Sequence, residues 1–83
     1  MNQLQKKIRS DRKKMAMTQE EFAAYVGISM ISVVRIEQGL MVSSNLAKKL
    51  AYHYKVNPIT IIEWNNSFGK VNFLDNVNKK EYN

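Results

Sequence analysis

The segment that most constrains the fold of this chain spans residues 18–39 and reads TQEEFAAYVGISMISVVRIEQG. Thr18 and Glu21 have the spacing of a capping box, which starts a helix. One side of that helix is apolar and consists of Phe22, Ala23 and Val26. Gly27 follows, and a glycine after a helical run favours the left-handed backbone that ends a helix. The pattern therefore predicts a helix over residues 19–26 that stops at a sharp turn.

A second short helix is expected directly after this turn. Ser29 can cap it, Val33 and Ile36 give it an apolar side, and Gly39 can end it, which predicts a helix over residues 30–38. The small side chain of Ala23 allows two helices joined by so short a turn to cross closely. Together the two helices have the pattern of a helix-turn-helix element, whose second helix is suited to the major groove of DNA.

The rest of the chain also shows helical periodicity, so the predicted fold class is all-α, a compact domain of five helices. The first helix is expected over residues 2–15, with Leu4, Ile8 and Met15 facing inward. A fourth helix is expected to be capped at Ser44 or Asn45. The fifth helix opens at Asn57 and Pro58, and its expected packing surface consists of Ile59, Ile61, Ile62 and Trp64.

The composition changes after Trp64. Residues 65–83 are rich in asparagine and lose helical periodicity, yet they keep several apolar side chains. The predicted organisation is therefore a helix-turn-helix domain over residues 1–64 and an extended or partly disordered C-terminal tail or arm over residues 65–83.

Composition excludes several functions. The 83 residues contain no cysteine, and the single histidine, His53, is expected to be packed or half-exposed rather than to be a ligand. The carboxylates do not have the spacing along the sequence that is typical of a metal site, and no apolar run is long enough to cross a membrane. The net charge of +6 favours a polyanionic partner. These features predict a soluble cytoplasmic protein without enzymatic activity, cofactor or metal.

Residues 4–64 resemble the lambda-repressor-like (Xre/Cro) helix-turn-helix regulators. The resemblance rests on the run at 18–21, the turn at 27–29 and the sequence at 35–39, which read TQEE, GIS and RIEQG. It implies the five-helix fold of that family, binding to a double-stranded DNA operator, a homodimer on a two-fold site, and the role of a phage or mobile-element switch.

The resemblance also implies roles for individual residues. The positions that would contact phosphates are Gln19, Ser29 and Gln38, and those that would read base edges are Met30, Ile31, Ser32, Val34 and Arg35. Arg35 is the strongest candidate among the base readers, because a guanidinium can donate two hydrogen bonds to guanine. Arg12 and Glu37 match a pair that ties the first helix to the end of the third, and Gly27 and Ala23 are expected to be structural.

Two departures from the family leave an alternative open. Met30 and Ile31 replace the usual polar or basic readers, and the loop that follows the third helix is apolar where relatives carry polar or basic residues. A possible partner-binding patch therefore consists of Met30, Ile31, Leu40, Met41 and Val42, although at least one of Leu40 and Val42 is expected to enter the core. Exposed apolar clusters of this kind are more typical of interfaces with proteins than of interfaces with nucleic acids. The alternative function is an antirepressor or modulator that binds a partner repressor.

Overall fold

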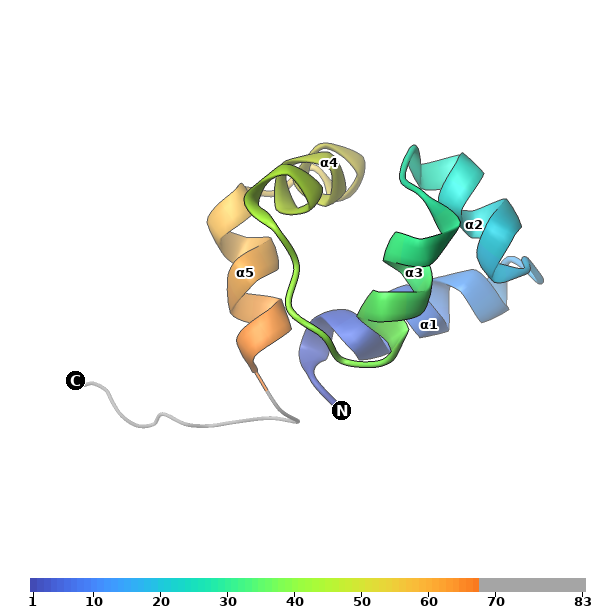
Figure 1. Cartoon of the computed structure of the whole chain (residues 1–83), viewed down its shortest axis with the longest axis horizontal. Helices are drawn as coiled ribbons and strands as arrows, with labels where there is room; N and C mark the ends of the chain where they lie inside the picture. The colour runs from blue at the N-terminus through green and yellow to red at the C-terminus, as the bar shows by residue number, and fades with distance from the viewer. Residues whose placement is uncertain (68–83) are drawn as a thin grey trace.

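The computed structural model describes residues 1–67, and this part of the chain forms five helices without a β-strand (Figure 1). The helices are α1 (Gln3–Lys14), α2 (Gln19–Val26), α3 (Met30–Glu37), α4 (Ser44–Tyr54) and α5 (Pro58–Asn66). Helices α4 and α5 pack together, and α1 connects this pair to α2 and α3 (Figure 1). The start and the end of the described chain are joined, since the amide of Gln3 donates to the carbonyl of Ser67 at 2.7 Å. The expectation of a compact all-α domain is confirmed.

The boundaries of the helices follow from residues that satisfy the free backbone groups at helix ends. In the capping box of α2, the Thr18 hydroxyl accepts from the Glu21 amide at 3.0 Å, and the Glu21 carboxylate accepts from the Thr18 amide at 2.9 Å. Both helices of the motif end at a glycine with positive φ, +89° at Gly27 and +84° at Gly39. These local signals lie where the sequence predicts them.

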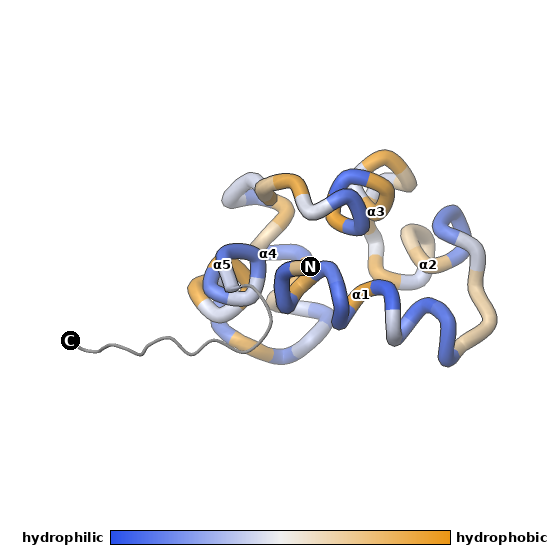
Figure 2. Tube along the Cα trace, turned by 90° about the horizontal axis from the view of Figure 1, so that it is seen from below, coloured by the Kyte–Doolittle hydropathy of each residue, from blue (hydrophilic) through white to orange (hydrophobic). Residues whose placement is uncertain are grey.

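The core lies where the five helices meet. Its fully or almost fully buried apolar side chains are Leu4, Ile8, Phe22, Ala23, Val33, Ile36, Ala47, Leu50, Ala51 and Ile61. Every helix contributes to this cluster, so the position and tilt of α3 depend on all of the others. In Figure 2, α3 lies at one edge of the molecule and is mainly hydrophobic, whereas α1 is mainly hydrophilic.

Two expectations about packing and capping are wrong. Met15 is 39% exposed, because α1 ends one residue before it and the chain turns at Ala16, which has a φ of +53°. Ser43 caps α4 instead of Ser44 or Asn45, and its hydroxyl accepts from the amide of Leu46 at 3.1 Å. Capping by Ser43 starts α4 earlier than either expected cap allows.

The expected packing surface of α5 is also partly wrong. Ile61 is fully buried and Trp64 packs against the core, but Ile59 is 60% exposed and Ile62 is 37% exposed. Residues three apart on a helix share one side, so Ile59 and Ile62 lie on a common outer stripe. Only the other side of α5 faces the other helices.

Helix α5 continues two residues beyond Trp64 and includes the buried Asn65. The division into residues 1–64 and 65–83 stays a prediction, and the expected tail from residue 68 onward lies outside the described residues. Among the helices described, none has the length and apolar character needed to cross a membrane.

Candidate nucleic-acid interface

The turn between α2 and α3 fixes how the two helices meet. The amides of Gly27 and Ile28 both donate to the carbonyl of Ala23, at 2.8 and 3.0 Å. Ala23 is only 3% exposed, so its small side chain lies within the packed region, as expected for a close crossing. Ser29 then caps α3, since its hydroxyl accepts from the amide of Ser32 at 3.0 Å and donates to the Ser32 hydroxyl at 2.9 Å. The first turn of α3 is therefore joined to its cap by two hydrogen bonds.

The outer side of α3 is largely free of other helices. Its inner residues Val33 and Ile36 are buried, whereas Met30 and Ile31 are 47% and 64% exposed. Arg35 and Gln38 are exposed on the following turns, and the two remaining predicted base readers, Ser32 and Val34, are half-buried. The structure therefore brings the five predicted base readers together on one helix, although only three of them project freely from it.

A buried ion pair holds this helix against the body of the domain. The guanidinium of Arg12 donates to both carboxylate oxygens of Glu37, with distances of 2.7 Å from Nε and 3.0 Å from Nη2. Only 16% of the Arg12 side chain and 8% of the Glu37 side chain are exposed. The hydrogen bond to Glu37 raises the pKa of Arg12, which keeps the guanidinium charged. A further bond from Nη1 to the carbonyl of Met17, at 3.1 Å, extends the contact to the segment before α2.

The same carboxylate fixes the side chain of Gln19. The Gln19 amide nitrogen Nε2 donates to Oε1 of Glu37 at 3.3 Å, so the first residue of α2 lies beside the last residue of α3. This contact places the N-terminus of α2 beside the C-terminal end of α3. The free amides of that N-terminus can bind an anion. The exposed carboxylate of Glu20 lies in the same first turn and opposes that attraction.

The loop between α3 and α4 divides the predicted apolar patch. Leu40 and Met41 are 43% and 84% exposed, but Val42 is half-buried and packs against the core. Asn65 of α5 fastens this loop, since its side-chain oxygen accepts from the amide of Val42 at 3.0 Å and its side-chain nitrogen donates to the carbonyl of Leu40 at 3.1 Å. Sequence reasoning missed Asn65. The available signal was its place four residues after Ile61, on the inner side of α5.

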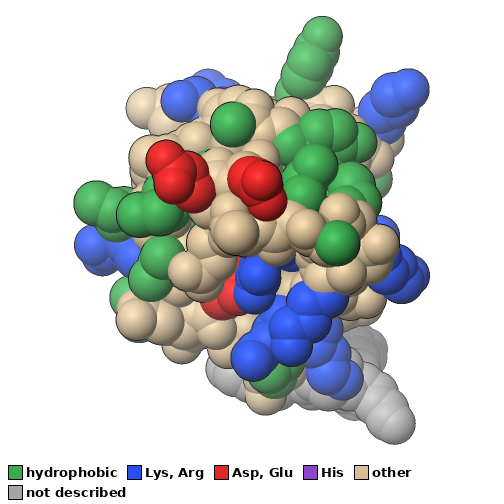
Figure 3. Space-filling model, turned by 90° about the vertical axis from the view of Figure 1, so that its right-hand side faces the viewer, with side chains coloured by type: hydrophobic (Ala, Val, Ile, Leu, Met, Phe, Trp, Pro, Cys, Tyr) green, Lys and Arg blue, Asp and Glu red, His purple; other side chains and the backbone are tan. Residues whose placement is uncertain are grey.

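Positive charge is distributed unevenly over the described surface. The exposed basic side chains of α1 are Lys6, Lys7, Arg9, Lys13 and Lys14. By contrast, Arg35 is the single basic residue in the sequence from Ser29 to Ser43, which covers α3 and its flanking loops. On the side formed by α2 and the end of α1, Lys and Arg side chains gather low on the face, at the level of α1 (Figure 3). The outer side of α3 is therefore mainly apolar instead of basic.

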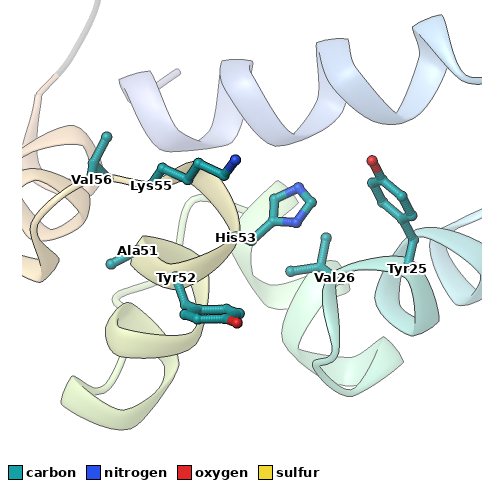
Figure 4. Close-up of a pocket in the computed structure, with 7 residues that line it drawn as sticks. All are labelled: Tyr25, Val26, Ala51, Tyr52, His53, Lys55 and Val56. Atoms are coloured by element: carbon teal, nitrogen blue, oxygen red, sulfur yellow. The ribbon is translucent and has the colours of Figure 1, made fainter.

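His53 belongs to a different part of the surface, an open hollow between α2 and α4 (Figure 4). Its ring contacts the ring of Tyr25 edge to face, with 5.2 Å between centroids, and the ring of Tyr54 at 4.8 Å. The histidine is half-buried in this aromatic cluster. Within residues 1–67, no group of three His, Cys, Asp or Glu side chains is placed to hold a metal ion.

The short turn, the close crossing of α2 and α3, and the uncovered outer side of α3 define a helix-turn-helix protein. The helix-turn-helix family model matches residues 8–61, and this chain belongs to that lambda-repressor-like family of DNA-binding regulators. Comparison with curated proteins and with solved structures gave no match.

Proposed function

We propose that this protein is a sequence-specific transcriptional regulator that places α3 in the major groove of a double-stranded DNA operator. The observation that carries the proposal is the outer side of α3, on which Met30, Ile31 and Arg35 are exposed. The N-terminus of α2 lies beside the end of the same helix, through the contact of Gln19 with Glu37. We further propose that it acts in the cytoplasm as a homodimer on a two-fold site, as part of a phage or mobile-element switch.

Each predicted contact has a chemical role in this proposal. Gln19 and the free amides of α2 hold a phosphate on one side of the groove, because the positive end of a helix attracts anions. Ser29 and Gln38 contact the backbone beside α3, and Arg35 donates two hydrogen bonds to a guanine. The Arg12–Glu37 pair keeps α3 at the angle that these contacts require.

The direct experiment is a binding titration at low salt, with a random-sequence duplex library and with genomic fragments as probes. A regulator of this kind gives a complex at micromolar protein or below, with a preferred sequence after selection. The slope of log affinity against log salt concentration counts the phosphates neutralised by cationic side chains. Sedimentation of the free and bound protein tests the homodimer. Absence of any complex at micromolar protein contradicts the proposal.

A second candidate function is that of an antirepressor or modulator, which covers the DNA-reading face of a partner repressor. Four exposed apolar side chains favour it, namely Met30, Ile31, Leu40 and Met41. Apolar anchors at the centre of a protein interface commonly cost about 2 kcal/mol or more when they are lost.

The test of this candidate is calorimetry with the purified regulator encoded beside this protein. Ile31→Asp is expected to abolish association, whereas Ile59→Asp, at a similarly exposed isoleucine of α5, is expected to leave it unchanged. Lack of association of the unmodified protein, together with tight binding to DNA alone, excludes the modulator.

A further inference from the structure

The outer side of α3 has an unusual chemistry for a surface that reads DNA. The two most exposed residues of its first turn, Met30 and Ile31, carry no hydrogen-bond donor or acceptor apart from the weakly accepting thioether. Val34 is aliphatic as well, and the half-buried hydroxyl of Ser32 accepts from the Ser29 hydroxyl at 2.9 Å and keeps a single neutral O–H donor of its own. Arg35 is therefore the one charged donor, and the one side chain with several N–H groups, among the five predicted base readers.

The major groove offers one apolar feature to such a surface, the 5-methyl group of thymine. The polar base-edge groups in that groove are hydrogen-bond donors or acceptors, and covering them with aliphatic side chains leaves them unpaired. A surface like that of Met30 and Ile31 therefore gains free energy at thymine and loses it at G·C pairs.

We infer that Met30 and Ile31 read thymine methyl groups and that Arg35 reads a guanine beside them. This inference rests on the proposed function, because it requires α3 to lie in the major groove. Ile31 and Arg35 are one turn apart, about 6 Å along the helix axis at ~1.5 Å per residue. Base pairs are stacked about 3.4 Å apart, so the thymines and the guanine lie within about three base pairs of each other.

The experiment starts from a duplex selected out of a random-sequence library and replaces its thymines one at a time with deoxyuridine. This exchange removes the methyl group and leaves the hydrogen-bonding groups of the base unchanged. Burial of one methyl group contributes ~0.8 kcal/mol, which corresponds to about a fourfold change in affinity. We expect about a fourfold loss at each of one or two positions and no change at the remaining thymines.

Variants of the protein connect this effect to the named side chains. The double variant Met30→Ala, Ile31→Ala is expected to bind the thymine and deoxyuridine duplexes equally. Ile59→Ala is the matched control, because Ile59 is 60% exposed, close to the 64% of Ile31, and lies on α5. It is expected to keep the full preference for thymine. Circular dichroism of each variant establishes that the helices are intact.

The possible outcomes separate the inference from the proposed function. In one outcome the protein binds the selected duplex specifically, but its affinities for the thymine and deoxyuridine duplexes agree within about twofold at every position. This result overturns methyl reading and leaves the DNA-binding regulator in place. Persistence of the methyl effect in the double variant assigns it to other residues and also overturns the inference. Failure to select any duplex rejects both proposals and leaves the partner-binding candidate.

Discussion

Removal of Arg12 tests how α3 is held against the rest of the domain. In the variant Arg12→Met, the Glu37 carboxylate remains almost fully buried and keeps only its contact with Nε2 of Gln19, at 3.3 Å. Breaking one side of a buried ion pair costs about 3–5 kcal/mol. We expect a value near the lower limit, about 3 kcal/mol, because part of the Arg12 side chain reaches solvent.

This loss is large for a small domain, since native proteins are stable by only about 5–15 kcal/mol. A loss of 1 kcal/mol lowers the melting temperature of a domain of 60–100 residues by roughly 4–8 °C, so the variant should melt about 12–24 °C lower. Thermal and urea denaturation followed by circular dichroism measure both quantities. The double variant Arg12→Met, Glu37→Leu is expected to recover most of the lost stability, because no charge is left buried without a partner.

A surface ion pair of the same domain provides the control. Lys7 lies 3.6 Å from Asp11, and 44% of the lysine side chain is exposed. Lys7→Met should cost less than about 1 kcal/mol, because solvent screens such pairs. The reasoning is refuted if Arg12→Met costs no more than Lys7→Met, or if the double variant is as unstable as Arg12→Met alone.

Three further predictions concern the predicted DNA contacts and the residues that fix the end of α3 and the loop after it. Arg35→Ala should lose about 1–3 kcal/mol of discrimination at one base pair, whereas Gln19→Ala should weaken binding to all sequences alike. Equal losses of affinity for both variants across a panel of single-base operator changes would contradict this division of roles. Gly39→Ala should lower the free energy of unfolding, measured by urea denaturation, by about 1–2 kcal/mol, because φ is +84° there and the new Cβ would lie 3.1 Å from Oε1 of Gln5. A loss below about 0.5 kcal/mol would show that the turn relaxes freely. Asn65→Ala should lower the free energy of unfolding by about 2 kcal/mol and speed hydrogen exchange in the loop after α3, because two backbone groups lose their partners. Unchanged hydrogen exchange would show that other contacts fix this loop.

The sequence by itself determined the local architecture of the motif. The capping box at Thr18, the cap at Ser29 and the positive φ of Gly27 and Gly39 depend on interactions between residues three to five positions apart. Such interactions are encoded in a short run of residues, so the ends of α2 and α3 could be predicted closely. The pairing of Arg12 with Glu37 was available as well, although only through the resemblance to a known family.

The tertiary structure decided which apolar residues reach solvent. The sequence places isoleucines on two sides of α5, and only the packing of that helix on α4 and α1 leaves Ile59 outside and Ile61 inside. In the same way, Val42 turns into the core while Met41 stays exposed. The cause is Asn65, 23 residues after Val42, which accepts from the Val42 amide and so fastens the loop between α3 and α4 to α5. These outcomes depend on contacts between distant parts of the chain, which a pattern read along a few residues does not contain.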